Sequence, residues 1–193
     1  LVIGAECLSR YLNYKDRETC ILFGDAAGAW VVTRTAENDS HVIMTSLLHA
    51  DGNLAELLTF EAGAARKPLT QKVLDNGEHF MKMKGREIFK SAVRTMASAS
   101  KEALALAHLT LDDIDWMIPH QANLRIIEAV AHHFDFPMKK VILSVHETGN
   151  TSAASIPCAF QIGKDEGKIK RGQTLLLTAF GAGLTSGSVI LRY

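Results

Sequence analysis

Hydrophobic and polar positions along this chain follow two spacings, one typical of helices and one of strands. Apolar side chains recur every three or four residues from about residue 85 to about residue 107, which predicts a long helix with one buried face. The same spacing predicts a second helix over residues 121–134. A short helix is expected after the capping sequence at residues 110–113, and another after residues 149–152, with Pro157 near its first turn.

Short apolar runs between these helices predict β-strands. The runs lie at residues 1–5, 20–23, 29–33, 42–48, 116–118, 141–145, 175–180 and 188–193. The last two are joined by a glycine-rich loop, so we expect them to pair antiparallel, whereas residues 50–76 are expected to be irregular. Because strands alternate with helices, the pattern predicts an α/β fold with a mixed, partly parallel sheet and helices packed on it.

Composition narrows the class of protein. The 193 residues are 47% hydrophobic and 22% charged, as in ordinary globular proteins, and they suffice for one sizeable core or two small ones. Lys+Arg and Asp+Glu both total 21, and this zero net charge argues against a general nucleic-acid or membrane-surface binder. No apolar run approaches the roughly 20 residues that span a bilayer.

The cysteines and the first residues of the chain lead to two further expectations. Three widely spaced cysteines without a CxxC motif disfavour a disulfide framework or a zinc site and favour a reducing cytoplasm. The chain begins inside an apolar strand pattern, at Leu1, without an initiator Met or a signal peptide. We therefore expect a fragment, a processed chain or a partly sequenced chain.

Three loops follow predicted strands, at the sheet edge where α/β proteins build their sites. His120 lies in the first loop and could donate a hydrogen bond or exchange a proton at a carbonyl group. Asn150 lies in the second and could offer its amide N–H to a developing oxyanion. Residues 181–183, Gly-Ala-Gly, form the third, where a backbone N–H could complete an oxyanion hole.

Each of these features also has a purely structural interpretation. A histidine can cap a helix, an asparagine is common in turns and caps, and glycine turns are frequent. No histidine pair shows metal-ligand spacing with carboxylates or cysteines, so no metal site is predicted. Cys158, beside Pro157, is interpreted as a small core residue.

Four segments of the chain carry a distinctive pattern: FGDAAGA at residues 23–29, PHQANLR at 119–125, GNTSAAS at 149–155 and AFGAG at 179–183. They occur in the order seen in β-ketoacyl-ACP synthase III, a family that the chain resembles along its whole length. The resemblance implies a thiolase-like fold, which has two similar α/β halves. Residues 1–40 would then be the end of the N-terminal half, and residues 41–193 would be the C-terminal half.

The resemblance also implies an activity, the decarboxylative Claisen condensation of acetyl-CoA, or another short acyl-CoA, with malonyl-ACP to start fatty-acid synthesis. His120 and Asn150 match two members of the family's Cys-His-Asn triad, which would bind the malonyl thioester carbonyl and stabilise the enolate left when carbon dioxide departs. The backbone N–H of Ala182 matches an oxyanion-hole donor. The nucleophilic cysteine would lie upstream of Leu1, so the chain alone is predicted to be inactive.

Substrate and partner sites are implied in the same way. The positions that match contacts to the CoA arm are Gly85, Phe89, Ala122 and Asn123. The positions that match the carrier-protein docking site are Gln121, Ala122, Asn123, Leu124 and Arg125. Five basic residues in or just before the predicted helix at residues 85–107 would either widen that site or form a solvated helix face: Lys82, Lys84, Arg86, Lys90 and Arg94. The CoA and carrier-protein thioesters would be substrates, with no metal or other cofactor, and the intact enzyme would be a cytoplasmic homodimer.

Several alternatives stay open. Gly-Ala-Gly in place of three glycines, and Ser186 in place of a bulkier residue, leave the acyl-chain preference undefined. A synthase with a polyketide, quinolone or branched-chain product would carry the same segments, and a non-catalytic subunit that docks a carrier protein would keep the same fold. A CoA-binding hydrolase is disfavoured because the chain has no serine nucleophile-elbow motif.

Overall fold

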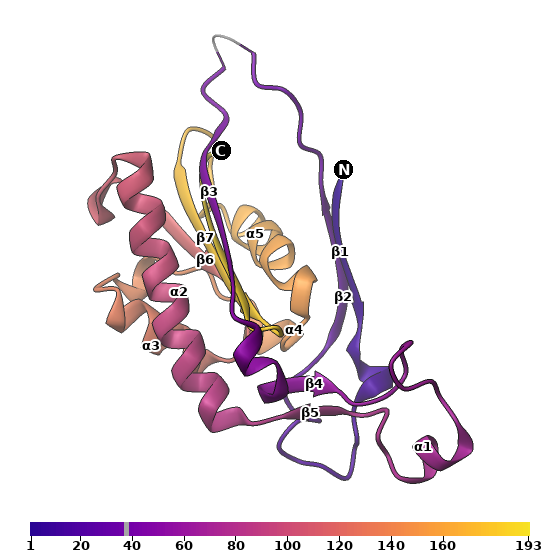
Figure 1. The fold of residues 1–193 in the computed structure, drawn as a ribbon. Coiled ribbons are helices and arrows are strands. Elements are labelled where there is room, and N and C mark those ends of the chain that lie inside the picture. Colours follow the sequence, from indigo (N-terminus) through magenta and orange to yellow (C-terminus); the bar gives the residue numbers. More distant parts are fainter. Residues whose placement is uncertain (37–38) are drawn as a thin grey trace.

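A four-stranded mixed sheet forms the centre of the molecule (Figure 1). The computed structural model describes residues 1–36 and 39–193. The strands follow one another across the sheet as β3 (Val42–Ala50), β8 (Thr185–Arg192), β7 (Thr174–Gly181) and β6 (Trp116–Pro119). β6 and β7 are parallel and the other neighbours are antiparallel, which confirms the mixed sheet and the antiparallel closing pair.

Helices cover both faces of this sheet. Successive residues of a strand point to opposite faces, so one strand supplies side chains to both helical layers. Leu176 packs against α2 (Gly85–Ala107) and α3 (Leu124–His133), whereas its neighbour Leu175 packs against α5 (Ser155–Asp165). Figure 1 shows the sheet between these two layers. The predicted helix at residues 85–107 is confirmed at both ends, and its buried face forms part of the main core.

A two-stranded hairpin lies beside the segment that leads into α5. Its strands β1 (Val2–Cys7) and β2 (Asp25–Trp30) are antiparallel, and the short 3-10 helix η1 (Leu8–Tyr11) follows β1. A Cβ atom on Gly4 would lie 2.3 Å from the Ala153 carbonyl oxygen. The hairpin therefore reaches this segment only because the position has no side chain.

A smaller two-stranded sheet precedes α2. The 3-10 helix η2 (Gly52–Leu57) leads into β4 (Leu58–Phe60), which pairs antiparallel with β5 (Met81–Met83). The helix α1 (Gln71–Asp75) lies between these strands in sequence. The expectation that residues 50–76 are irregular was wrong for the parts that form η2, β4 and α1.

The strand predicted at residues 20–23 is absent, and the strand predicted at residues 29–33 is confirmed only at Ala29 and Trp30, where β2 ends. Phe23 forms an isolated parallel bridge with Asn150 instead of a strand of its own. β2 begins two residues later at Asp25, whose carboxylate accepts hydrogen bonds from the N–H and hydroxyl of Ser9. The local pattern does not reveal these partners.

Residues 141–145 do not form the predicted strand. Only the first of them bridges to β6, and the N–H groups of Ser144 and Val145 donate to the side-chain oxygen of Gln121, at 2.8 and 3.1 Å. The short helix α4 (Val145–Thr148) follows. The buried Gln121 amide thus occupies the donors that a neighbouring strand would need.

The remaining boundaries depend on capping. α3 begins at Leu124 and not at residue 121, because the Asn123 side chain accepts the N–H of Ile126 at 2.9 Å. The predicted capping box at Thr110 is confirmed. Three further 3-10 turns are η3 (Leu111–Asp113), η4 (Met138–Lys140) and η5 (Ser152–Ala154). The predicted N-terminal half, residues 1–40, includes two residues outside the described part, and the division at residue 40 stays a prediction.

Candidate active site

His120 is fixed at the end of β6 by its backbone and by its ring. Its backbone N–H donates to the Thr178 carbonyl of the neighbouring strand at 2.7 Å, which continues the parallel pairing of β6 with β7. Its ring Nδ1 lies 2.6 Å from the hydroxyl oxygen of Ser155, the first residue of α5. Among the described residues, no group is hydrogen-bonded to the other ring nitrogen, Nε2.

The charge of this ring follows from its surroundings. Burial lowers the pKa of His120 from its ordinary value to about 4, because a cationic ring loses solvation there. The imidazole is therefore neutral near pH 7 and carries a single N–H. A neutral ring of this kind can donate one hydrogen bond to an oxygen atom without bringing a full positive charge to it.

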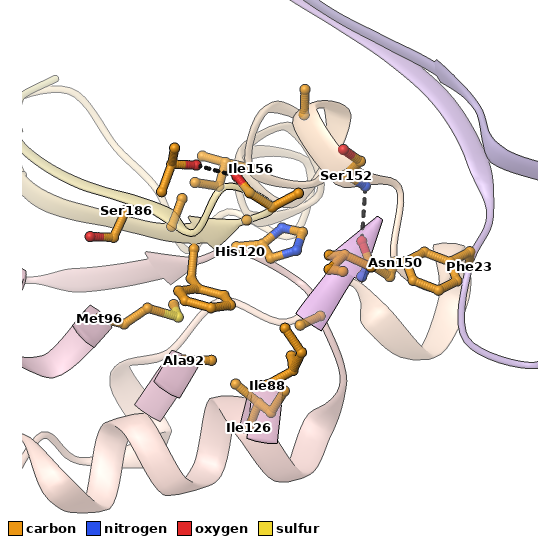
Figure 2. Close-up of a pocket in the computed structure, with 18 of the residues that line it drawn as sticks. Phe23, Ile88, Ala92, Met96, His120, Ile126, Asn150, Ser152, Ile156 and Ser186 are labelled. Carbon is orange, nitrogen blue, oxygen red and sulfur yellow. Dashed lines mark hydrogen bonds between the residues drawn. The ribbon is translucent and has the colours of Figure 1, made fainter. Parts of the chain in front are cut away.

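Asn150 is held in a tight turn beside the hairpin. Its backbone N–H donates to the Leu22 carbonyl at 2.8 Å, and its own carbonyl accepts the N–H of Gly24 at 2.9 Å. The side chain is nearly buried, and its Oδ1 accepts the N–H of Ser152 at 2.9 Å (Figure 2). Because a backbone N–H requires an oxygen acceptor, this contact fixes the amide orientation and leaves the N–H2 group free to face a ligand.

Two glycines make this turn possible. Gly149 has a φ of +66°, in the region that glycine adopts without strain. A Cβ atom on Gly24 would lie 2.2 Å from the Thr148 carbonyl oxygen. The segments at residues 23–29 and 149–155, which the sequence analysis singled out separately, therefore pack directly against each other at these positions.

His120 and Asn150 line the same cavity, which has a volume of about 1620 Å³ (Figure 2). Apolar side chains of α2 and α3 form part of its wall: Ile88, Ala92, Met96 and Ile126. A large cavity with apolar walls and a few convergent polar groups is typical of a small-molecule site. The structure thus brings together the two side chains that the sequence analysis placed in separate loops.

The third predicted loop lies at the same cavity. Ala182 is exposed in the turn between β7 and β8 and lines the cavity, and its carbonyl accepts the Thr185 hydroxyl at 3.0 Å. The turn is tied to the end of β3, because Asp51 and Leu184 exchange two backbone hydrogen bonds of 2.8 Å each. This pairing holds the loop at the end of the sheet where His120 also lies, because β6 and β7 are parallel.

All four residues matched to the CoA arm also line the cavity. Gly85 and Phe89 lie in the first turns of α2, and Ala122 and Asn123 lie between His120 and α3. The Asn123 side-chain oxygen already caps α3, so its remaining polar group is the amide N–H2. Phe89 and Ala122 pack against the same hydrophobic cluster, so the start of α2 and the loop before α3 meet in this part of the wall.

The residues matched to carrier-protein docking separate into two groups. Leu124 and Arg125 are exposed at the start of α3. Gln121 is fully buried, and its amide N–H2 donates to the carbonyls of Pro119 and Ile142. Its side chain therefore organises the loop around the site, and the structure contradicts the expectation that it lies on a docking surface.

Ser155 was not predicted as a site residue, although it lies in the GNTSAAS segment. It contacts His120 across 35 positions of sequence, and no local pattern indicates that contact. The cavity lining within the described residues contains none of the three cysteines, and burial raises the pKa of the Cys158 thiol. Within residues 1–36 and 39–193, no group of three or more His, Cys, Asp or Glu side chains could hold a metal ion, and no helix is long and apolar enough to cross a membrane.

Two family models match the chain. The model described as 3-Oxoacyl-[acyl-carrier-protein (ACP)] synthase III matches residues 1–52. The model described as 3-Oxoacyl-[acyl-carrier-protein (ACP)] synthase III C terminal matches residues 104–193. The first match ends at Gly52, and the second contains His120 and Asn150.

Curated proteins and solved structures give the same assignment. The Beta-ketoacyl-[acyl-carrier-protein] synthase III of Roseiflexus sp. (strain RS-1) is 44% identical over 100% of this chain and 58% of that protein. The protein of the same name from Wolbachia pipientis subsp. Culex pipiens (strain wPip) is 48% identical over 100% of this chain and 57% of that protein. The crystal structure of 3-oxoacyl-[acyl-carrier-protein] synthase III from Aquifex aeolicus VF5 matches with a TM-score of 0.87 and 45% identity, over 100% of this chain and 57% of that one.

The chain therefore spans a little over half the length of the curated relatives it matches. Its mixed sheet and packed helices are those of the corresponding part of a thiolase-like fold. Together, the sequence matches and the fold show that the chain belongs to the β-ketoacyl-ACP (3-oxoacyl-ACP) synthase III family.

Proposed function

We propose that the intact protein containing this chain condenses acetyl-CoA, or another short acyl-CoA, with malonyl-ACP. The observation that supports this most is that His120 and Asn150 line one cavity with largely apolar walls, each with a donor group not tied to the protein. The names of relatives that are 44% and 48% identical support the same reaction.

In the proposed reaction, the bond between the malonyl Cα and its carboxylate breaks, and carbon dioxide leaves. The electron pair of that bond passes into the thioester and forms an enolate. Nε2–H of His120 and Nδ2–H of Asn150 would donate to the enolate oxygen, where the negative charge develops. The enolate carbon then attacks the carbonyl carbon of an enzyme-bound acyl thioester, and the enzyme thiolate leaves. Apolar walls strengthen both hydrogen bonds by excluding water.

The acyl group is proposed to be carried by a cysteine outside this chain, because none of the cysteines in the described residues lines the cavity. The thiolate of that cysteine would attack acyl-CoA and release CoA as the leaving group. The backbone N–H of Ala182 is proposed to stabilise the oxyanion of this step. On this proposal the isolated chain has no condensing activity.

We further propose that the substrate arm enters along Gly85, Phe89, Ala122 and Asn123, and that the carrier protein docks beside Leu124 and Arg125. The exposed guanidinium of Arg125 supports this, since carrier proteins of this class are acidic and an exposed cation steers an acidic partner. No metal or additional cofactor takes part in the proposed chemistry. Treatment with EDTA is accordingly expected to leave the condensation rate of the full-length protein unchanged.

The test uses the full-length protein with acetyl-CoA and malonyl-ACP, and mass spectrometry detects the β-ketoacyl-ACP product. We expect product from the wild type and a severe loss with His120→Ala or Asn150→Ala. His133→Ala and Asn76→Ala make the same changes at exposed positions and are expected to keep wild-type rates. A folded wild-type protein that gives no product with any short acyl-CoA would contradict the proposal.

A panel of acyl-CoA primers distinguishes a fatty-acid synthase from the related synthases with other products. Acetyl-CoA, branched-chain acyl-CoAs and aromatic acyl-CoAs are compared by kcat/KM on the same full-length protein. A preference for acetyl-CoA supports the start of fatty-acid synthesis. A preference for the branched or aromatic primers would assign the protein to a related polyketide, quinolone or branched-chain synthase.

A further inference from the structure

We propose that Ser155 is a positioning residue that holds the His120 imidazole in the tautomer with its proton on Nε2. The two residues meet at the end of β6 and the start of α5, where the Ser155 hydroxyl oxygen lies 2.6 Å from Nδ1. The distance alone allows either atom to be the donor. The direction of the bond follows from the other partners of Ser155.

Ser155 is 1% exposed, so its hydroxyl has to find its partners within the protein. Its oxygen accepts the backbone N–H of Gln121 at 3.4 Å. Among the residues that the structure describes, the only acceptor at hydrogen-bonding distance from this hydroxyl is Nδ1 of His120. The hydroxyl proton is therefore directed at Nδ1, which acts as the acceptor.

A neutral imidazole that accepts at Nδ1 carries its single proton at Nε2. In the opposite arrangement Nδ1–H would donate to Ser155, and the hydroxyl proton would have no acceptor in a buried position, which costs free energy. The low pKa of His120 is consistent with a neutral ring. The tautomer thus follows from the hydrogen bonds of one buried serine.

The donor to Ser155 is itself held rigidly. Gln121 is fully buried, and its side chain bonds to the carbonyls of Pro119 and Ile142 and to the N–H groups of Ser144 and Val145. Its backbone N–H therefore keeps its direction toward the Ser155 oxygen. Because the Ser155 oxygen accepts this N–H, the hydroxyl proton is left to donate to Nδ1 of His120, its acceptor among the described residues.

The catalytic consequence rests on the proposed function. With the proton on Nε2, His120 presents a donor to the cavity, as Asn150 does because its Oδ1 is bound by the Ser152 N–H. With the proton on Nδ1, a lone pair of Nε2 would face the enolate oxygen and repel it. Ser155 would thereby make the ring a partner of Asn150 in stabilising the enolate.

The test reads the tautomer directly. Full-length protein labelled with ¹⁵N-histidine is studied at pH 7 by long-range ¹H–¹⁵N correlation, and the His120 signals are assigned by their loss in His120→Gln. We expect an unprotonated Nδ1 and a protonated Nε2 in the wild type. In Ser155→Ala, the Nδ1 signal should shift and a second tautomer should appear. A protonated Nδ1 in the wild type would overturn the proposal.

Ser144→Ala is the matched control, because Ser144 is also a buried serine and its hydroxyl has no partner among the described residues. Its His120 spectrum is expected to equal that of the wild type, and an unchanged spectrum in Ser155→Ala would also overturn the proposal. If Ser155→Ala does not fold, the wild-type spectrum decides alone.

Kinetics supply the second measurement. In Ser155→Ala, kcat for condensation is expected to fall about tenfold with little change in KM, the loss associated with one misdirected hydrogen bond. The spectrum needs no substrate, so the two proposals fail separately. A wild type with the expected tautomer but no condensation would refute the proposed function and leave the assignment of Ser155 intact.

Discussion

The side-chain oxygen of Asn150 is bound to the protein, and its N–H2 group faces the cavity. Replacement by aspartate tests the two atoms separately, because it keeps the oxygen and removes the donor. Asn150→Asp keeps an oxygen for the Ser152 N–H, so the turn is expected to stay folded. The same change replaces the N–H2 donor by a carboxylate oxygen, which would repel an enolate. We expect kcat of the full-length protein to fall by about 10²–10³, the usual loss for one oxyanion donor, or by more because of the added charge.

The control for this variant is Asn13→Asp, because the Asn13 side-chain oxygen also accepts the N–H two residues later, that of Lys15, and Asn13 does not line the cavity. Thermal unfolding of both variants should resemble that of the wild type. Wild-type kcat in Asn150→Asp would exclude the amide from the chemical step.

His120 also links the stability of the fold to pH. Its pKa is about 4 in the folded protein against an ordinary value of 6.5, so the unfolded state binds more protons between these two values. The contribution of this ring to the free energy of unfolding is therefore complete above pH 6.5. It decreases by at most about 3 kcal/mol as the pH falls toward 4.

Denaturant titrations at pH 7 and pH 5 measure this effect, and the decrease should be smaller in His120→Gln than in the wild type. The other titrating groups remain in both proteins, so their contributions cancel in the difference. Identical pH dependence of the two would show that burial does not disfavour the charged ring.

At the scale of elements, the sequence predicted best what depends on neighbours in the chain. Residues 85–107 form one helix because their apolar side chains share one face over six turns, and the capping box at Thr110 needs only three residues. Residues 20–23 failed as a strand because the N–H groups of Cys20 and Leu22 donate to carbonyls of the preceding turn residues. Residues 141–145 failed because the distant side chain of Gln121 accepts the N–H groups of Ser144 and Val145.

The sequence predicted the main residues of the candidate site, but not the contacts that they make with distant parts of the chain. His120 and Asn150 stand in recognisable segments, and their positions after strands indicated a sheet edge. The contact of His120 with Ser155 and the burial of Gln121 depend on how β6, α3 and α5 pack, which the linear pattern does not specify. The same packing overturned the docking role expected of Gln121.

The hairpin packs closely against the segment that leads into α5, and the addition of a single methyl group tests this contact. Gly4→Ala places a Cβ atom 2.3 Å from the Ala153 carbonyl oxygen, and the backbone has to move because neither atom is flexible. We expect a loss of about 1–3 kcal/mol in the free energy of unfolding, measured by denaturant titration. Gly52→Ala adds the same methyl group in open space and is the matched control. Equal stability of the two variants would contradict the close packing.

At the scale of the whole molecule, the cavity depends on every layer of the fold. Its wall includes Gly4 of the hairpin, Phe60 of the small sheet, Phe89 of α2 and Ala182 of the β7–β8 turn. The central sheet positions His120 and the β7–β8 turn, whereas the segment before β2 positions Asn150. A substrate in this cavity would therefore contact segments that are far apart in sequence, which explains why the matched segments are spread along the whole chain.

The exposed start of α3 connects this cavity to the surface where we propose that a carrier protein docks. Arg125→Glu reverses a charge at that edge, and such charges act mainly on the encounter with the partner. We expect the KM for malonyl-ACP to rise about fivefold at low salt, with the KM for acetyl-CoA unchanged, and the difference to shrink as salt screens the charge. Lys101→Glu makes the same reversal on the last turns of α2 and should leave both constants unchanged. If both variants raise the KM equally, net charge rather than a docking site at α3 controls the encounter.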